Sequence, residues 1–235
     1  MQQIKPPYAA HARRVSLLCS LTGSDTFLSI YKTADEHSSA VIFISGSDKM
    51  LSHKGTQIIK TERLLLREIK ESDYRDIYEY AKKEKVAKYV SWNAHTSIND
   101  SKAVCKMWAA QYENGDKYHW AIVYNGKMIG SIEVVKLVDD IAYLGWTLDS
   151  AYWNNGIMTE AAAAVRDFLF EEIGVRALYA CYITENIGSG RVMQKIGMNS
   201  CTPEEYYIPL GIKDLKTEAD GMPLSFYFLK KEVKV

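Results

Sequence analysis

The chain lacks several features that would place it in a specialised class of proteins. Its 235 residues carry 29 basic and 29 acidic side chains, so no excess charge favours nucleic acid or an anionic membrane surface. No apolar run approaches the roughly 20 residues of a membrane-spanning helix. The apolar stretch after Arg13-Arg14 is too short, and too soon broken by Ser and Thr, for a secretory signal. We therefore expect a cytoplasmic protein that binds neither nucleic acid nor membranes.

Cysteine and histidine are sparse and scattered. The four cysteines show no paired spacing and the five histidines do not cluster, so neither a disulfide framework nor a metal site is predicted. With 47% hydrophobic residues, the chain can bury one sizeable core. Residues 1–56 lack strong helical periodicity and are expected to form an extension of uncertain order. Residues 40–44 alternate as one strand would, but we prefer an extension without a catalytic role.

From residue 57 onward, strand and helix patterns alternate. Strands are predicted over residues 63–69, 119–124, 128–137, 141–148 and 177–183, with Asn125-Gly126 as a hairpin turn. Helices are predicted over residues 74–83, after an N-cap at Ser72-Asp73, and over residues 99–113, where Val104, Met107, Trp108 and Tyr112 form a core stripe. Because a helix joins the last two strands, these two must be parallel. The pattern predicts an α/β fold with a mixed, mostly antiparallel central sheet flanked by helices.

A polar turn leads directly into a helix pattern after the strand at residues 141–148. Asn154-Asn155-Gly156 precedes Ile157-Met158-Thr159, and apolar side chains then recur at helical spacing over residues 161–173. The first amides of a helix lack intrahelical partners and lie at the positive end of its dipole, so such a turn can hold a phosphate without a basic side chain. Taken alone, the turn is equally well explained as an ordinary loop.

A second segment favours the phosphate-binding interpretation. After the strand at residues 177–183, Asn186-Ile187-Gly188-Ser189 opens a short helix that ends at Gly197. Together with Tyr152–Ala161, this segment resembles the GNAT superfamily of N-acetyltransferases, and within it the branch that acetylates the N-termini of ribosomal proteins. The resemblance covers roughly residues 57–232, including Thr61–Arg67 and Phe226–Lys230. It implies a GNAT domain over residues 57–235 that uses acetyl-CoA as co-substrate.

The resemblance also implies which residues hold acetyl-CoA. Main-chain amides of the turn bind the pyrophosphate, the strand before the turn lies along the pantetheine arm, and Asn186 and Ser189 contact the cofactor. Trp146 and Leu148 can be core residues at the same time, and Asn186 can simply cap its helix. Asn154 and Met158 depart from the family's small residues, but we expect a site built from the backbone to persist. The implied cofactor-binding residues are Trp146, Thr147, Leu148, Asn154, Asn155, Gly156, Ile157, Met158, Thr159, Asn186 and Ser189.

Acetyl transfer further requires a neutral amine and a proton for the leaving thiolate. Ser189 is the candidate donor to the thiolate, because Met193 stands where many relatives have an acidic Tyr. Tyr143 replaces the family's frequent Glu base, although a phenol with an ordinary pKa near 10 is a poor base. Glu133, on the neighbouring strand, is the candidate base. The alternative is that Glu133 is a solvated strand residue and that the enzyme positions an amine that is already neutral.

The segment Tyr89–His95 is similar to the family's loop between the first two helices. Trp92 and His95 can bind the substrate, or they can equally pack the loop onto the domain. We predict direct transfer from acetyl-CoA to a primary amine, on a protein N-terminus or a small molecule, in a ternary complex. The chain is also compatible with a homodimer. The alternative function is a non-catalytic acyl-CoA-binding module, suggested by the replaced Glu and Tyr.

Overall fold

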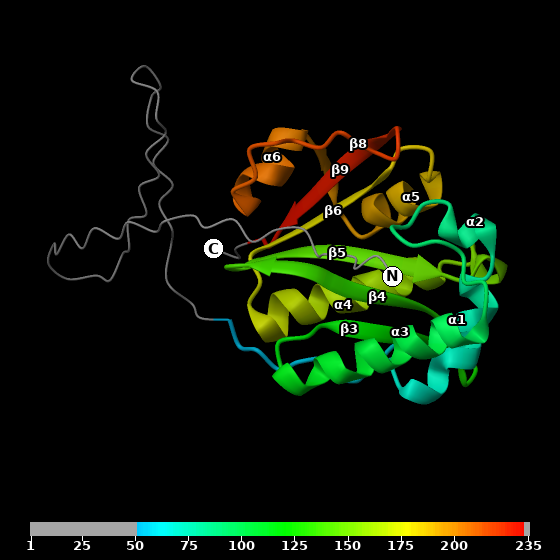
Figure 1. Cartoon of the computed structure of the whole chain (residues 1–235). Coiled ribbons are helices and arrows are strands. Elements are labelled where there is room, and N and C mark those ends of the chain that lie inside the picture. Colours follow the sequence, from blue (N-terminus) through cyan, green and yellow to red (C-terminus); the bar gives the residue numbers. More distant parts are fainter. Residues whose placement is uncertain (1–50, 233–235) are drawn as a thin grey trace, which may run out of the picture. The chain divides into compact units, whose positions relative to one another are not determined.

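A computed structural model describes residues 51–232 of the chain (Figure 1). The compact unit begins at Leu51, before the expected boundary at residue 57. Thr56 shows why residues 51–56 belong to it, because this side chain is buried and its hydroxyl donates to the carbonyl of Lys117 and accepts from the N–H of His119. The segment at residues 40–44, which alternates as a strand would, lies outside the described residues.

The unit is organised by one central sheet. Its strands are β1 (Ile59–Lys60), β2 (Leu64–Glu68), β3 (His119–Tyr124), β4 (Lys127–Val138), β5 (Ile141–Leu148), β6 (Ala177–Ile183), β7 (Asn199–Cys201), β8 (Glu218–Ala219) and β9 (Met222–Lys230). Across the described residues, the strand order is β1-β2-β3-β4-β5-β6-β9-β7, with β8 paired to β9. The β5–β6 pair is parallel, whereas the other pairs are antiparallel. The expected mixed, mostly antiparallel sheet is therefore confirmed.

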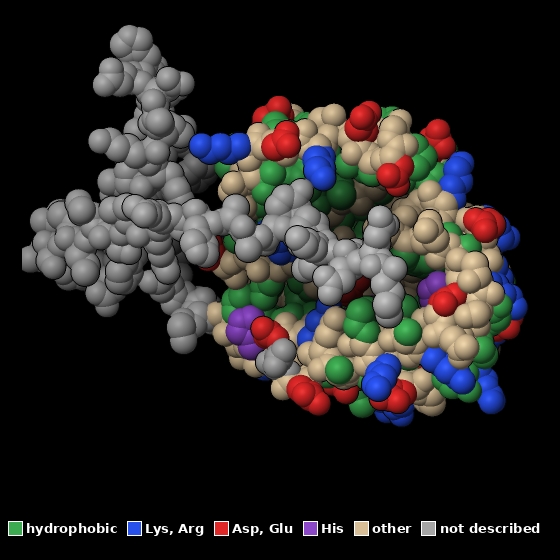
Figure 2. All heavy atoms as spheres, in the orientation of Figure 1, with side chains coloured by type: hydrophobic (Ala, Val, Ile, Leu, Met, Phe, Trp, Pro, Cys, Tyr) green, Lys and Arg blue, Asp and Glu red, His purple; other side chains and the backbone are tan. Residues whose placement is uncertain are grey.

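Helices cover both faces of this sheet. They are α1 (Tyr74–Ala81), α2 (Glu84–Ala87), α3 (Ile98–Ala110), α4 (Ile157–Phe168), α5 (Ile187–Lys195) and α6 (Pro203–Tyr207). Helix α4 continues as one π-helical turn, Leu169–Ile173. None of the helices within residues 51–232 is long and apolar enough to cross a bilayer. On the face shown in Figure 2, basic and acidic side chains are interspersed over the described part of the surface.

The alternation of side chains along the strands separates three apolar clusters. Trp120 and Ile122 of β3 face the main core, to which α4 and α5 contribute, while Ala121 and Val123 face a second core under α1 and α3. A third cluster, around Tyr143, Tyr179, Tyr206 and Phe226, lies between the sheet and α6. Because directly paired residues share a face, the second and third clusters lie on the same side of the sheet.

The floor between these two clusters consists of small or polar residues. Ser131 pairs with Thr147, and Glu133 pairs with Gly145, so all four side-chain positions point to the face that carries α1, α3 and α6. The main apolar core thus packs on the α4 face of the sheet, whereas the opposite face has a polar strip along β4 and β5.

The described structure corrects one detail of the expected core. Met107 of α3 is 51% exposed and does not belong to a buried stripe, whereas Ser101 and Cys105 are the residues of this helix that are buried. Trp108 and Tyr112 do pack against the second core. The inward face of α3 and of the turn that follows it thus includes positions 101, 105, 108 and 112, which are separated by three or four residues as a helix face requires.

Candidate active site

The sheet opens between its two parallel strands. β5 and β6 pair only over Ile141–Tyr143 and Ala177–Tyr179. Beyond that point β5 pairs with β4 alone and β6 with β9 alone, so the facing main-chain groups of Leu144–Leu148 have no strand partner among the described residues. Such an exposed edge can accept an extended ligand by main-chain hydrogen bonds. This is where the pantetheine arm was expected.

The turn after β5 has the backbone that a phosphate-binding loop needs. Asn154 and Gly156 adopt left-handed conformations, with φ of 62° and 72°. Gly156 is the N-cap of α4, and the first helical hydrogen bond runs from the N–H of Glu160 to its carbonyl at 3.0 Å. The N–H groups of Ile157, Met158 and Thr159 precede that bond and therefore lack helical acceptors.

The two departures from the family pattern in this turn are accommodated locally. Asn tolerates the left-handed region better than most residues, which explains how Asn154 stands where a small residue was expected. The Met158 side chain is only 5% exposed and packs in the main core together with Ile157, so its bulk points away from the turn. Asn155 donates from its side chain to the carbonyl of Trp153 at 3.1 Å. The turn thus keeps its open backbone.

The residues of β5 beside the opening combine two roles. Leu148 is buried and Trp146 packs against the main core, so the interpretation of these side chains as core residues agrees with the structure. Thr147 points to the opposite face, beside Ser131. Their main-chain groups remain at the open edge, and the predicted contact with the pantetheine arm stays a prediction.

Asn186 holds Ser189 at the start of α5. The Asn186 side chain accepts from the N–H of Ser189 at 3.4 Å and donates to its hydroxyl at 3.1 Å. Gly190 has the Tyr182 hydroxyl only 2.5 Å from where a Cβ would stand, so the first turn of α5 lies tightly on β6. The expected capping role of Asn186 is present, and the same contact fixes the Ser189 hydroxyl beside the end of β6.

Glu133 lies on the polar strip, one strand from the open edge of β5. Its Oε2 is 3.2 Å from Nζ of Lys117 and 4.0 Å from Nδ1 of His119. Burial, together with the nearby Lys117, lowers the pKa of His119 to about 3, so this imidazole is neutral at physiological pH. The Glu133 side chain is 30% exposed, which leaves it accessible to a ligand on this face.

The structure places Tyr143 unfavourably for catalysis. Its ring is 2% exposed and stacks on Tyr179 at 5.3 Å, and its hydroxyl donates to the carbonyl of Tyr206 at 3.1 Å. Burial raises the pKa of this phenol further above its ordinary value. A buried phenol whose proton is held by a carbonyl cannot accept a proton from an amine at neutral pH. This geometry argues against the expected role of Tyr143 as a base.

Trp92 and His95 pack the loop that contains them onto the domain. His95 donates its main-chain N–H to the carbonyl of Ala81 at 3.0 Å, and its Nδ1 is 2.7 Å from the buried Ser101 hydroxyl. Trp92 lies against the His95 ring at 5.5 Å and packs on the second core. Burial lowers the pKa of His95. These contacts agree with the packing interpretation, while a contact with substrate remains a prediction.

Three lysines around the short helix α2 make contacts that the sequence pattern does not predict. Lys83 lies 2.5 Å from the buried Asp149 carboxylate at the end of β5. Lys85 lies 6.0 Å from the ring of Trp153, and Lys88 lies 3.4 Å from the carboxylate of Glu185 before α5. Helix α2 therefore contacts segments on both sides of the opening. A helix of four residues gives no periodic signal by which the sequence could have shown this.

The Lys83–Asp149 pair leads to a stability prediction. Asp149→Asn should lower the free energy of unfolding by about 1–2 kcal/mol, because the Lys83 cation loses its partner. Because the Lys83 side chain is 30% exposed, the loss of stability should be smaller than for a fully buried pair. Urea titration provides the measurement, and Glu79→Gln, which breaks the exposed Lys82–Glu79 pair, is the control with an expected loss below about 0.5 kcal/mol. Equal losses for the two variants would contradict this assignment.

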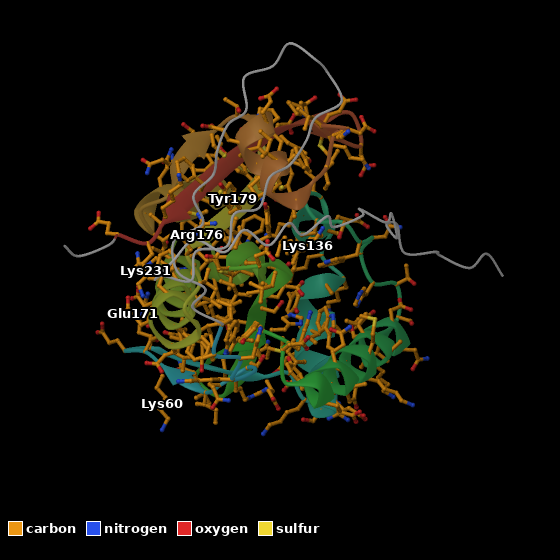
Figure 3. All side chains as sticks on the ribbon, turned by 90° about the vertical axis from the view of Figure 1, so that its left-hand side faces the viewer. Lys60, Lys136, Glu171, Arg176, Tyr179 and Lys231 are labelled. Carbon is orange, nitrogen blue, oxygen red and sulfur yellow. The ribbon has the colours of Figure 1, made fainter. Side chains whose placement is uncertain are left out.

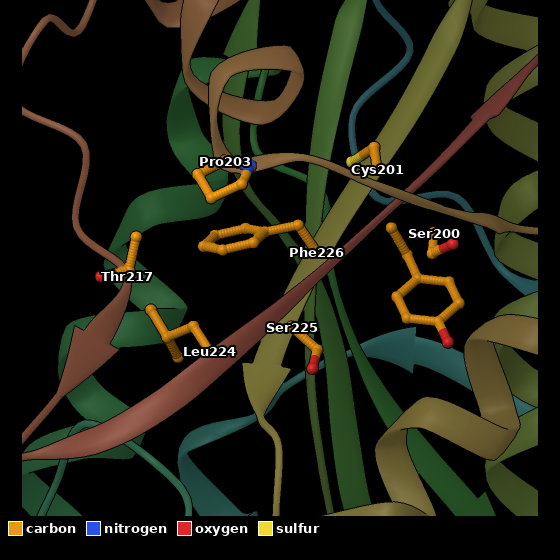
Figure 4. A pocket seen from close by; sticks show the side chains of 8 residues that line it. Ser200, Cys201, Pro203, Thr217, Leu224, Ser225 and Phe226 are labelled. Carbon is orange, nitrogen blue, oxygen red and sulfur yellow. The ribbon is translucent and has the colours of Figure 1, made fainter.

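A hollow of about 290 Å³ lies between β7, β9 and the segment that contains α6 (Figure 4). Pro203, Thr217, Leu224 and Phe226 line it, together with Ser200 and Cys201. Among the described residues, the side chains that line this hollow are uncharged.

Comparisons with known proteins agree with this geometry. The family described as "Acetyltransferase (GNAT) domain" matches residues 63–199. The uncharacterized N-acetyltransferase YnaD of Bacillus subtilis is 33% identical over 162 residues, covering 63% of this chain and 94% of its own. A GNAT-family acetyltransferase structure from Bacillus anthracis has a TM-score of 0.59 at 24% identity, covering 74% of this chain and 98% of its own.

The ribosomal L7/L12 alpha-N-protein acetyltransferase RimL, solved with coenzyme A, has a TM-score of 0.62 at 17% identity, and the match covers 74% of this chain and 98% of that one. At this identity the likeness shows a shared fold. The family match, the named relatives and the sheet opening lead to the same conclusion, which is that the chain belongs to the GNAT family of acetyl-CoA-dependent N-acetyltransferases.

Proposed function

We propose that this N-acetyltransferase moves the acetyl group of acetyl-CoA directly to a primary amine within a ternary complex. The observation that carries the proposal is the open edge of β5, which lies between a turn whose amides lack helical acceptors and a polar strip on the opposite face. Acetyl-CoA supplies the activated thioester. The two sides of the sheet allow cofactor and amine to approach the reacting carbon from different directions.

The cofactor is held mainly by main chain in this proposal. The amides of Ile157, Met158 and Thr159 receive the pyrophosphate, which is where the helix dipole favours negative charge. The edge of β5 at Trp146–Leu148 pairs with the pantetheine amides. The left-handed Gly156 allows the phosphates to approach the backbone. Among the described residues, its two chain neighbours aside, Nη2 of Arg63 is the one heavy atom within 4 Å of the position that a Cβ would take.

The acceptor amine lies over the polar strip of Ser131, Glu133, Gly145 and Thr147. Glu133 removes one proton from the ammonium form of the amine, directly or through one water, and the neutral nitrogen then attacks the thioester carbonyl. The carbon–sulfur bond breaks, and the Ser189 hydroxyl donates a hydrogen bond to the leaving thiolate. The second proton that the nitrogen loses passes to the thiolate and gives the free thiol of coenzyme A. In the transition state, Glu133 stabilises the positive charge on the amine nitrogen, and Ser189 stabilises the negative charge on the leaving sulfur.

The thiols of the described residues support direct transfer. Burial raises the pKa of Cys105 to about 12 and that of Cys201 to about 11, and it also raises the pKa of Cys181. Thiols with raised pKa values carry little thiolate at neutral pH and are poor nucleophiles. An acetyl-enzyme intermediate on these cysteines is therefore disfavoured, as a ternary-complex mechanism requires.

The acceptor is a protein N-terminus or a small amine, and we place the enzyme in the cytoplasm. RimL is named for acetylating a ribosomal protein at its N-terminus. The proposal is tested by incubating the full chain with acetyl-CoA and pooled N-terminal peptides or small amines, while thiol release and acceptor mass are recorded. An acetylated amine is expected. Binding of acetyl-CoA without thiol release from any pool would support the non-catalytic alternative.

Ser189→Ala should lower kcat roughly 10-fold or more and leave acetyl-CoA affinity nearly intact, because the lost hydrogen bond forms mainly in the transition state. Single-turnover kinetics and calorimetry measure the two quantities. Ser200→Ala, at an exposed position in the middle of β7, is the control and should behave as wild type. An unchanged kcat for Ser189→Ala, with chemistry rate-limiting, would remove Ser189 from the mechanism.

A further inference from the structure

Arg63 stands at the phosphate-binding turn although it lies far from it in the chain. Its Nη1 donates to the carbonyl of Asn155 at 3.0 Å, and its Nε donates to Oε2 of Glu160 at 2.6 Å. Its main-chain N–H donates to Oε1 of Glu160 at 2.9 Å. The third guanidinium nitrogen, Nη2, lies 3.5 Å from the position that a Cβ on Gly156 would take. Arg63 therefore contacts three consecutive parts of the site: the turn, the N-cap and the first helical turn.

The negative charge of Glu160 explains why an arginine is needed at this place. It lies in the first turn of α4, where a carboxylate suits the helix dipole but would repel a pyrophosphate. Burial raises the pKa of Glu160, but hydrogen bonds from the Thr61 hydroxyl and from Arg63 outweigh that effect and hold the pKa below its ordinary value. The carboxylate is therefore ionised at neutral pH, and its charge is compensated by the guanidinium.

Residues 152–161 contain Glu160 but no Lys or Arg. A dianionic pyrophosphate held there by amides alone would face one uncompensated carboxylate. The Arg63 side chain is 39% exposed, so its outer edge is accessible to a ligand at the turn while its inner edge is engaged by Glu160. The planar guanidinium fork can make both contacts at once, which a lysine ammonium cannot reproduce.

We propose that Arg63 is a cofactor-binding residue that holds the turn through Glu160 and Asn155 and offers its Nη2 edge to the pyrophosphate of acetyl-CoA. This inference rests on the proposed placement of the pyrophosphate at the turn. Arg63 thereby adds a side chain to a site whose other predicted contacts with the pyrophosphate are main-chain amides. It also explains why β1 and β2, through the Thr61–Arg63 turn, are tied to α4.

The test separates contact with the pyrophosphate from mere support of the fold. Wild type, Arg63→Gln and Arg63→Lys are titrated by calorimetry with coenzyme A and with pantetheine, which lacks the pyrophosphate. Arg63→Gln should raise the Kd for coenzyme A roughly 10-fold or more, the size expected for a lost charge-assisted hydrogen bond, and should leave the Kd for pantetheine within about twofold. The Kd of Arg63→Lys for coenzyme A should lie between the values for wild type and Arg63→Gln.

Two further variants guard the interpretation. Lys60→Gln removes a cation from the neighbouring strand, where the side chain points outward (Figure 3), and should leave both Kd values unchanged. Glu160→Gln keeps the arginine charge but removes its partner, so coenzyme A should bind as tightly as to wild type or more tightly. The salt dependence of coenzyme A binding should fall in Arg63→Gln and persist in Glu160→Gln.

Three results for the variants, and one for wild type, would overturn the inference. One is an equal loss of affinity for coenzyme A and pantetheine in Arg63→Gln, because a merely structural role affects both ligands. Another is a loss in Glu160→Gln as large as in Arg63→Gln, since Arg63 would then act only through the carboxylate. The third is an unchanged Kd for coenzyme A in Arg63→Gln. If wild type itself fails to bind coenzyme A more tightly than pantetheine, the placement of the pyrophosphate fails, and the inference with it.

Discussion

Gly156→Pro should raise the Kd for acetyl-CoA by roughly 100-fold or more. Proline fixes φ near −65°, whereas Gly156 has a φ of 72°, so the turn must change its path. The α4 amides that follow would then no longer converge on the pyrophosphate, and the new ring would stand against Nη2 of Arg63. Calorimetry with acetyl-CoA measures the loss.

The control for this variant is Gly211→Pro. Gly211 has a similar φ of 65° and follows the short helical segment Ile208–Leu210 as its C-cap. It lies outside the proposed site. Both variants place proline where its φ cannot be adopted, so a shared loss of stability affects both. Acetyl-CoA affinity should fall in Gly156→Pro alone. If Gly156→Pro binds acetyl-CoA as wild type does, the turn is not the pyrophosphate site.

Much of the fold could be predicted because its signals are local. The strands β5 and β6 have the expected bounds, and the Asn125-Gly126 hairpin has positive φ at both residues, as its type of turn requires. The strands β1, β7 and β8 were not predicted. They have two or three residues each, too few to show an alternating pattern.

The candidate site was less predictable because its side chains meet across long sequence distances. Arg63 and Glu160 are separated by 97 residues, and Lys83 and Asp149 by 66, so no local spacing indicates either pair. Tyr143 shows the opposite problem. The sequence pattern places Tyr143 where relatives often have a Glu, but it does not show that α6 covers this part of β5 or that the carbonyl of Tyr206 accepts a hydrogen bond from the Tyr143 hydroxyl. The environment of Tyr143 is thus determined by contacts with α6, a helix that the sequence pattern does not predict.

The Glu133 carboxylate is the group on which the chemistry of the amine depends in our proposal. Glu133→Gln should reduce kcat/KM by roughly 100-fold, because an amide of the same size cannot accept a proton and general-base catalysis is typically worth that much. The acidic limb of the kcat/KM profile, measured with an identified amine, should disappear together with the carboxylate. Affinity for acetyl-CoA should stay unchanged, since Glu133 faces the acceptor side of the sheet.

Lys117→Gln distinguishes catalysis from support. Lys117 Nζ lies 3.2 Å from Oε2 of Glu133, so both variants break the same ion pair, but only Glu133→Gln removes the carboxylate. If the ion pair merely holds β4 to the segment before β3, the two variants should lose activity to the same extent. If Glu133 accepts the proton, Lys117→Gln should retain most of the activity and the acidic limb, because the freed carboxylate can still reach the amine. Identical pH profiles for wild type and Glu133→Gln would instead show that the enzyme positions an amine already neutral in solution, whose fraction rises with pH whatever residue stands at 133.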